Sequence, residues 1–194
     1  HFKTVNDLHG HVTGDKLLQA SALAIREALP QNALTARLGG DEFACLFAFD
    51  PEHPAMVEEV ADRIVTRLSQ PFDLDGVHAH VSASLGIACL DGECDGTDPL
   101  MRRADIAMYA AKKSGRNRLC WFDASMEREL QARNTIEAGL RLGIPGGEFV
   151  PYYEQQVDLE TGALQGFEVL ARWEHPTRGV IAPDIFIPIA EETG

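Results

Sequence analysis

Residues 37–43 read RLGGDEF, with the adjacent glycines Gly39 and Gly40 placed between two short apolar runs. Glycine adopts the positive φ that a tight hairpin turn requires, so this pattern predicts a β-hairpin. Two glycines also allow a ligand to approach the backbone closely. The neighbouring carboxylates of Asp41 and Glu42 suit a hard cation such as Mg²⁺, which prefers oxygen ligands. The alternative is a plain turn followed by solvated acids on an edge strand.

Outside this stretch, apolar residues recur at helical spacing in three segments and at strand spacing in several others. An aspartate cap is expected at the start of the third helix and lysines at its end. The expected elements, in chain order, are helix 13–29, strands 33–38 and 42–49, helix 54–69, strands 71–76 and 78–89 around Asp75-Gly76, helix 98–113 and strand 118–122. This order predicts an α+β (mixed α/β) sheet domain with flanking helices.

The character of the chain changes after residue 122. A polar helix is expected over 123–143, and Pro145-Gly146-Gly147 is expected to break the chain. Two strand-like runs and a short helix follow, at 148–158, 164–173 and 183–192. We therefore expect a first domain over 1–122, a linker helix over 123–146 and the start of a second domain over 147–194. The linker either transmits orientation between domains or is a solvated connector.

Composition excludes several classes of function. The 194 residues carry 17 Lys and Arg against 30 Asp and Glu, a net charge of −13, which lacks the basic footprint of a nucleic-acid-binding protein. No apolar run approaches the roughly 20 residues that cross a bilayer, so no direct membrane contact is expected. No CxxC pair occurs, and Cys45, Cys89 and Cys120 lie in apolar stretches, as small core residues do. These features favour the cytoplasm, and the segment that we expect upstream of His1 can still tether the parent protein to a membrane.

Two further segments carry residues suited to a nucleotide. Residues 2–15 follow the pattern FKxxNDxxGHxxGD, in which Asn6 offers a donor and an acceptor and Asp15 two acceptors, enough to read a guanine edge. The alternatives are a loop amide and a helix-capping acid. Downstream, Lys112 and Arg116 stand four residues apart at a helix end and can address one phosphate chain. Their alternative role is to complement the helix dipole.

Taken together, FKxxNDxxGHxxGDxLL, RLGGDEF and YxAKxxGRN resemble the GGDEF family of diguanylate cyclases from residue 1 to about residue 122. The resemblance implies a nucleotidyl-cyclase-like sheet domain that condenses two GTP into cyclic di-GMP and two pyrophosphates. It implies a homodimer with one GTP in each half-site, and Mg²⁺ or Mn²⁺ as cofactor. Each 3′-hydroxyl attacks the α-phosphate of the other nucleotide.

The same resemblance implies a role for each matching residue. Asn6 and Asp15 correspond to guanine readers, Asp41 to a metal ligand, and Glu42 to a residue that assists deprotonation of the 3′-hydroxyl or binds the metal. The remaining substrate-binding positions are Phe2 and Lys3 in a turn that touches the terminal phosphates, Gly39 and Gly40 in the signature, and Lys112 and Arg116 as triphosphate clamps.

Two departures from the family pattern matter. The family carries a strand with metal-binding aspartates just before the FK pair, so we expect that strand to precede His1 and this fragment alone to be inactive. The family's product-inhibition site uses an RxxD motif, and the corresponding stretch here is Pro30-Gln31-Asn32-Ala33. The sequence therefore predicts no product inhibition through that site.

The second segment contains three notable stretches, residues 149–157, Gly166-Phe167-Glu168-Val169-Leu170-Ala171-Arg172-Trp173, and Pro183 with Phe186-Ile187-Pro188. Together they resemble the start of an EAL domain, a metal-dependent cyclic di-GMP phosphodiesterase with a (β/α) barrel. Glu168 matches the signature's metal-binding glutamate and Arg172 a residue near the bound dinucleotide. The signature reads Glu-Val-Leu rather than Glu-Ala-Leu, and Tyr153-Glu154-Gln155 replaces Tyr-Gln-Pro. The roughly 48 residues are far fewer than the 200 or more of a barrel, so this fragment is not expected to hydrolyse cyclic di-GMP.

Three functions of the parent protein remain open from sequence. The first is a cyclase that makes cyclic di-GMP. The second is a catalytically silent GTP-binding module that regulates an EAL phosphodiesterase, and the third is a protein that acts chiefly as a phosphodiesterase. The histidines add little, since His11 is expected to be structural and His78 with His80 to form a surface pair.

Overall fold

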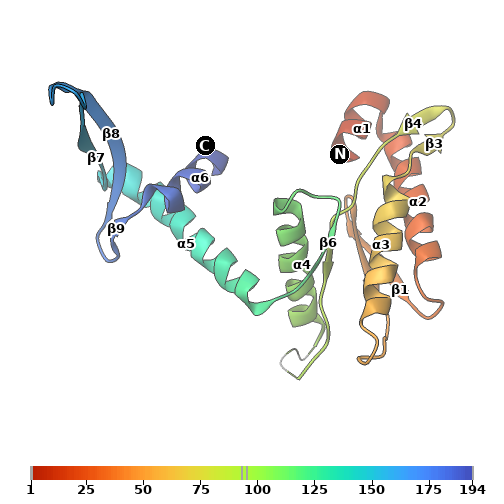
Figure 1. Ribbon diagram of the computed structural model, residues 1–194. Helices are drawn as coiled ribbons and strands as arrows, with labels where there is room; N and C mark the ends of the chain where they lie inside the picture. The colour runs from red at the N-terminus through yellow and green to blue at the C-terminus, as the bar shows by residue number, and fades with distance from the viewer. Residues whose placement is uncertain (1, 93, 95, 194) are drawn as a thin grey trace. The chain divides into compact units, whose positions relative to one another are not determined.

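The computed structural model describes residues 2–92, 94 and 96–193. The chain divides into two compact units, residues 1–126 and 127–194 (Figure 1). Each unit has its own hydrophobic cluster. The two units are described in turn.

The first unit combines helices with three separate strand pairs. Strands β1 and β2 pair antiparallel, β3 and β4 pair antiparallel, and β5 and β6 pair parallel. Its elements are α1 (Phe2–His9), α2 (His11–Ala28), β1 (Leu34–Gly39), β2 (Glu42–Leu46), α3 (Ala55–Ser69), β3 (Phe72–Leu74), β4 (Val77–Ala79), β5 (Leu85–Ile87), α4 (Thr97–Lys113) and β6 (Leu119–Trp121).

The core of this unit forms where α2 and α3 lie side by side (Figure 1). Leu17 and Ile25 of α2, Val60 and Ile64 of α3, and Phe72 of β3 are all buried in it. These side chains recur at helical spacing along one face of each helix, which is the pattern that predicted both helices from sequence. The core thereby fixes α2, the helix that carries Asp15.

A βαβ arrangement forms the other part of the unit, because α4 connects the parallel strands β5 and β6. Gly86 of β5 faces α4 so closely that an added Cβ would lie 2.0 Å from the carbonyl oxygen of Ala104 and 2.3 Å from the amide nitrogen of Met108. Only glycine admits this contact between two backbones. It fixes α4, whose last turn carries Lys112.

Several sequence expectations about this unit are wrong in detail. Residues 2–9 form a helix that was not predicted, because α1 is short and buries only Val5. The expected strand 78–89 is divided, since β4 pairs with β3 while β5 pairs with β6. Asp98 lies in the first turn of α4, whose cap residue is Gly96 without a side-chain cap bond. Cys45 is exposed rather than in the core.

The second unit packs two helices against one antiparallel sheet in the order β7-β8-β9. Its elements are α5 (Ala124–Gly146), β7 (Phe149–Val157), β8 (Leu164–His175), β9 (Gly179–Ile181) and α6 (Pro183–Thr193), with the first residues of α5 assigned to the first unit. Helix α5 continues through Pro145, where a break was expected, and ends before Gly147 at φ 71°.

The core of the second unit surrounds Trp173, which is 1% exposed. The ring of Phe149 stacks on it with centroids 5.1 Å apart, and that of Phe186 meets it edge-on at 5.9 Å. Its indole nitrogen donates a hydrogen bond of 2.8 Å to a carboxylate oxygen of Glu148. Gly139 of α5 lets the ring approach, since a Cβ there would lie 2.7 Å from the indole.

Within the described residues, none of the helices combines the length and the apolar character that crossing a membrane would require.

Candidate functional site

The RLGGDEF stretch forms the predicted hairpin. Arg37 lies opposite Phe43, and Gly39 lies opposite Glu42, with a shift in register between the two pairs. Gly40 adopts φ 50°, the left-handed conformation expected of a turn glycine. Arg37 stabilises the turn, because its Nε donates a hydrogen bond of 2.9 Å to the carbonyl oxygen of Gly40. Both carboxylates therefore emerge from a defined turn.

Asp41 and Glu42 are exposed at this turn and have no side-chain hydrogen bond or ion pair with any residue that the structure describes. Their oxygens are the ligand type that Mg²⁺ prefers. Over residues 2–92, 94 and 96–193, no three His, Cys, Asp or Glu residues are grouped so as to hold a metal ion. The donor chemistry therefore fits Mg²⁺, with two carboxylates supplied by the hairpin.

The helices that carry the two candidate base readers pack closely at a glycine. Asn6 comes from α1 and Asp15 from α2, and Gly14 lies buried just before Asp15. A Cβ on Gly14 would lie 1.8 Å from Oδ1 of Asn6, so the amide occupies the space that a larger residue would fill. The backbone also links the helices, since the amide of Gly10 donates to the carbonyl of Asn6 at 2.9 Å. The Asn6 amide thus lies against the residue that precedes Asp15.

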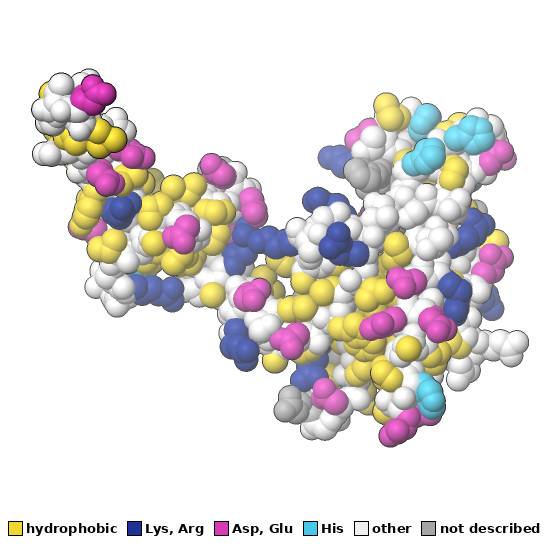
Figure 2. Space-filling model, viewed as in Figure 1, with side chains coloured by type: hydrophobic (Ala, Val, Ile, Leu, Met, Phe, Trp, Pro, Cys, Tyr) yellow, Lys and Arg dark blue, Asp and Glu magenta, His cyan; other side chains and the backbone are white. Residues whose placement is uncertain are grey.

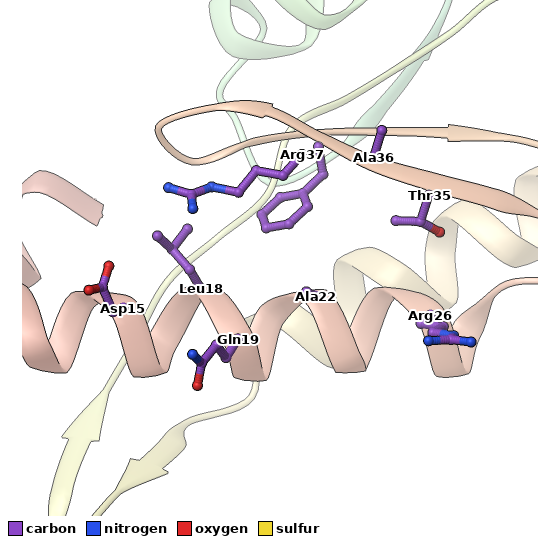
Figure 3. Close-up of a pocket in the computed structure, with 9 residues that line it drawn as sticks. Asp15, Leu18, Gln19, Ala22, Arg26, Thr35, Ala36 and Arg37 are labelled. Carbon is purple, nitrogen blue, oxygen red and sulfur yellow. The ribbon is translucent and has the colours of Figure 1, made fainter.

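An open cavity of about 490 Å³ lies between α2 and the hairpin (Figure 3). Asp15 and Leu18 border it from the helix, and Arg37 and Phe43 border it from the hairpin. The guanidinium of Arg37 points toward the end of the cavity where Asp15 and Leu18 lie (Figure 3). The full lining is Asp15, Leu18, Gln19, Ala22, Arg26, Thr35, Ala36, Arg37 and Phe43. Of the predicted site residues, this cavity contains Asp15 alone.

Phe2 and Lys3 form the first turn of α1 rather than a loop. The first four amides of a helix lack intrahelical acceptors, so backbone donors are available at this position. Phe2 packs against the core, whereas Lys3 is exposed. The structure thus anchors this turn through the phenyl ring and leaves the ammonium group in solvent.

Lys112 and Arg116 lie on either side of the end of α4, where the sequence also predicted the helix to end. Lys112 lies in the last turn of α4, but the helix ends at Lys113. Gly115 at φ 112° and Arg116 at φ 58° turn the chain out of the helix. Both cationic side chains are exposed, and neither forms an ion pair within the described part of the chain. Their separation is set by a turn rather than by helical periodicity.

Other charged groups of the first unit are spread over its surface. Acidic and basic side chains are interspersed on the face in view in Figure 2. His78 and His80 are exposed, as the sequence predicted. Lys16 of α2 forms an ion pair with Asp75 in the β3–β4 turn, and this ammonium lowers the pKa of the Asp75 carboxyl.

In the second unit, Glu168 and Arg172 lie on β8, four residues apart and therefore on the same face of the strand. Trp173 follows on the opposite, buried face. Glu168 is exposed opposite Glu154 of β7. The guanidinium of Arg172 lies 5.6 Å from the centre of the Tyr152 ring, in a cation–π arrangement. The two proposed EAL residues thus lie on one face of β8, two side-chain positions apart along that face.

Sequence reasoning did not identify two residues that shape the first site, Gly14 and Arg37. A glycine inside a predicted helix is a signal for a close approach, because it lowers helix stability unless packing requires it. Arg37 stands inside the quoted stretch, but its hydrogen bond to Gly40 depends on the fold of the turn. Both residues act through contacts within the chain, and the sequence alone does not reveal these contacts.

The chain matches two protein-family models. Residues 1–118 match the model described as diguanylate cyclase, GGDEF domain, and residues 137–194 match the EAL domain. The first match covers the hairpin, both base-reading candidates and both cationic residues. The second begins within α5 and covers Glu168 and Arg172.

Curated relatives match the whole of the chain. The bifunctional diguanylate cyclase/cyclic di-GMP phosphodiesterase MucR of Pseudomonas aeruginosa is 40% identical over 193 residues, which cover 100% of this chain and 28% of MucR. The cyclic di-GMP phosphodiesterase PdeR of Escherichia coli strain K12 is 36% identical over 193 residues, covering 100% of this chain and 29% of PdeR. The chain therefore spans less than a third of the length of either relative.

Among solved structures, the GGDEF domain of TpbB (YfiN) from Pseudomonas aeruginosa superposes with a TM-score of 0.60 at 39% sequence identity. The match covers 67% of this chain and 76% of that chain. It confirms the mixed α/β fold predicted from the order of helices and hairpins.

Proposed function

The chain belongs to the GGDEF family of diguanylate cyclase domains, and from this membership we propose that its first unit binds GTP and makes cyclic di-GMP. In the proposed reaction, two copies of the unit each hold one GTP. The 3′-oxygen of one nucleotide attacks the α-phosphorus of the other, a new phosphodiester bond forms, and pyrophosphate leaves. Two such steps close the ring of cyclic di-GMP.

The observation that supports this proposal is the packing of the Asn6 side chain against Gly14, the residue before Asp15, which brings the amide of α1 to the segment of α2 that carries the carboxylate. Guanine presents ring and exocyclic N–H donors beside an O6 acceptor, and the two side chains offer the complementary groups. The neighbouring cavity, bordered by Asp15, Leu18 and Phe43, gives an apolar wall for the base. GTP specificity follows from this pairing of a base edge with fixed polar groups.

The remaining proposed residues address the phosphates. Lys112 and Arg116 offer unpaired cations, which offset the charge of a triphosphate on a chain with a net charge of −13. Asp41 and Glu42 would hold Mg²⁺ or Mn²⁺, which when bound neutralises charge on the phosphate oxygens. Glu42 is proposed to accept the proton of the 3′-hydroxyl. Gly39 and Gly40 leave room beside the hairpin for the phosphates.

A second candidate function is a GTP-binding module that does not turn GTP over and instead regulates an EAL phosphodiesterase. It is favoured by the EAL segment that follows the first unit and by the absence of an RxxD motif at residues 30–33. The EAL match over 137–194 and the printed activity of PdeR agree with it. In the EAL segment, Glu168 is proposed as a metal ligand and Arg172 as a contact to cyclic di-GMP.

We also propose that the cyclase lacks the feedback site of its family. Residues 30–33 form a turn in which the amide of Ala33 donates to the carbonyl of Pro30 at 3.0 Å, and no side chain in it is charged. Cyclic di-GMP added to the enzyme should therefore not inhibit it through this turn. Micromolar binding to the first unit that is lost on mutating residues 30–33 would contradict this.

The function is tested with the full-length parent protein, including any residues that precede His1 or follow Gly194. The protein is incubated with GTP and Mg²⁺, and cyclic di-GMP is measured by chromatography. Glu42→Gln should lower the rate about 100-fold or more, because a general base contributes 10²–10⁴-fold. Glu27→Gln, at an exposed glutamate near the end of α2, is the matched control and should leave the rate unchanged.

Product that is made by the parent protein and lost only in Glu42→Gln supports the cyclase. GTP binding without any product in the parent protein supports the regulatory module instead. Absence of both contradicts the two functions together.

A further inference from the structure

The turn after α4 contains three consecutive residues in the left-handed region. Gly115 adopts φ 112°, Arg116 φ 58° and Asn117 φ 49°. Residues other than glycine rarely adopt positive φ, although asparagine does so more readily than most. Arg116 therefore occupies a backbone conformation that the surrounding structure must maintain.

Hydrogen bonds fix this turn from three elements. The amide of Arg116 donates to the carbonyl of Ala111 in α4 at 3.1 Å, and the amide of Leu85 in β5 donates to the carbonyl of Arg118 at 2.9 Å. The third contact comes from α3, whose last residue, Ser69, lies 2.9 Å through its hydroxyl from Oδ1 of Asn117. The turn is thus held on both sides of Arg116.

The Ser69 hydroxyl also lies 2.8 Å from the carbonyl oxygen of Val65 in its own helix. A hydroxyl has one proton and cannot donate it fully to both acceptors. Both contacts are satisfied when Ser69 donates to Val65 and the Asn117 amide, turned by 180°, donates to Ser69. The pair therefore joins α3 to the turn through the asparagine side chain in a single defined geometry.

We propose that Ser69 and Asn117 form a positioning pair that holds the backbone of Arg116 ready for the phosphates of the bound nucleotide. This inference rests on the proposed function, because it assigns Arg116 to a phosphate ligand. The Arg116 guanidinium is exposed and has no internal partner within the described residues, so nothing else orients it before a ligand arrives. Fixing its backbone beforehand lowers the entropy that binding must remove.

The test measures binding of GTP and of GMP to the parent protein by calorimetry in the presence of Mg²⁺, with all variants made in a Glu42→Gln background so that GTP is turned over slowly. Ser69→Ala removes the partner of Asn117 without changing the turn itself. The expected result is an affinity for GTP that falls about 3- to 10-fold, the range for the loss of one hydrogen bond. The affinity for GMP, which lacks the outer phosphates, should change less. Ser69→Thr keeps the hydroxyl and should restore GTP affinity.

Ser114→Ala is the matched control, because the Ser114 hydroxyl lies in the same turn but bonds only to Ala110 of its own helix, at 2.5 Å. It should leave the affinity for both nucleotides unchanged. Thermal unfolding followed by circular dichroism shows whether each variant is folded. A second variant, Asn117→Gly, keeps the positive φ available while removing the amide, and should weaken GTP binding as Ser69→Ala does.

Three results would overturn the proposal, and they are distinguishable. If Ser69→Ala binds GTP as tightly as Ser114→Ala, the pair does not position Arg116. If affinity for GTP and GMP falls equally and the unfolding midpoint falls with it, the pair has only a structural role. If the parent protein without a change at Ser69 or Asn117 binds neither nucleotide, the proposed function itself fails, and the role of the pair fails with it.

Discussion

The two units build their cores in different ways. The first spreads burial over many aliphatic side chains of α2 and α3, such as Leu17 and Val60, whereas the second gathers aromatic rings around Trp173 alone. Their candidate sites differ in the same sense. The residues proposed for the first come from α1, α2, the hairpin and the end of α4 with the turn after it, whereas those proposed for the second, Glu168 and Arg172, lie on a single strand. A core that many elements share can fix segments far apart in the sequence relative to one another. A nucleotide site built from several such segments requires this.

Each unit contains one of the chain's two tryptophans, which allows this difference to be measured. Trp121 lies in β6 of the first unit, where its indole nitrogen donates to Glu58 at 2.9 Å. Trp173 is the centre of the second unit's core. In variants with Trp121→Phe or Trp173→Phe, the remaining fluorescence reports the unfolding of one unit only.

The largest effect is expected from Gly86→Ala in the first unit. The added Cβ would meet backbone atoms of α4 at 2.0 and 2.3 Å, and a backbone cannot rotate away as a side chain can. Separating β5 from α4 should cost about 3 kcal/mol or more of unfolding free energy, at the upper end for overpacking. Denaturant titration should show an earlier Trp121 transition and an unchanged Trp173 transition. Gly92→Ala, with open space around it, is the control.

If both tryptophan signals shifted together in Gly86→Ala, the two units would unfold as one. That outcome would contradict the division of the chain at residues 126 and 127.

A smaller effect is expected from Gly139→Ala in the second unit. Its Cβ would lie 2.7 and 2.9 Å from carbons of the Trp173 ring, which must shift within a packed aromatic cluster. The cost should be about 1–3 kcal/mol, seen only in the Trp173 transition. Gly146→Ala in the same helix meets Glu148 at 3.7 Å, an ordinary contact, and should cost far less. Equal costs for the two variants would show that Trp173 is not the centre of this core.

Sequence reasoning identified the parts of the first unit in which local patterns decide the structure. Helices α2 and α3 follow from apolar residues at helical spacing, and the hairpin follows from Gly39-Gly40 between apolar runs. The division of 78–89 into β4 and β5 could not be predicted this way, because β5 is defined by pairing with β6, more than 30 residues later. Whether a short segment forms a strand depends on the segment that it pairs with, and the local sequence pattern does not reveal that segment.

The candidate site shows the same limit. The chemistry of Asn6, Asp15, Asp41 and Glu42 is visible in the sequence, since it depends on residue type. The end of α4 between Lys112 and Arg116 was also predicted, but the left-handed residues through which the chain leaves the helix were not. The contact between Asn6 and Gly14 depends on the packing of α1 against α2, and α1 itself was not predicted.

Gly14→Ala tests whether that contact serves ligand binding rather than the core. The Cβ would displace the Asn6 side chain, which can rotate, so the Trp121 unfolding transition should change little. Affinity for GTP should fall about 10-fold, as expected when one base contact worth about 1.4 kcal/mol is lost. Asn6→Ala should have the same effect, and the double variant should be no worse than either, since both changes remove one interaction. Additive losses would show that Gly14 acts independently of Asn6.

The smallest effect is expected from the charges in two turns, one in each unit. In the β7–β8 turn, the carboxylate of Asp158 accepts three hydrogen bonds. The amide of Thr161 donates at 2.7 Å, the hydroxyl of Thr161 at 2.9 Å and the amide of Glu160 at 3.0 Å. These bonds lower the pKa of the Asp158 carboxyl. The pKa of Asp75 in the β3–β4 turn is lowered instead by Lys16, through a hydrogen bond and its charge. A lowered folded-state pKa stabilises the fold above the ordinary value of 3.8, and the contribution is lost as pH falls through the lowered value.

Asp158→Asn and Asp75→Asn should therefore each slightly lower the unfolding midpoint at pH 7, in the Trp173 and Trp121 transitions respectively. Both differences from the unmodified chain should disappear in strong acid. Salt distinguishes the causes, because screening weakens an exposed ion pair but has less effect on hydrogen bonds between neighbouring residues of one turn. At 1 M NaCl the Asp75→Asn effect should shrink while the Asp158→Asn effect persists. Equal sensitivity to salt would mean that the Asp158 turn is also stabilised by long-range charge, and the contrast between the two turns would be lost.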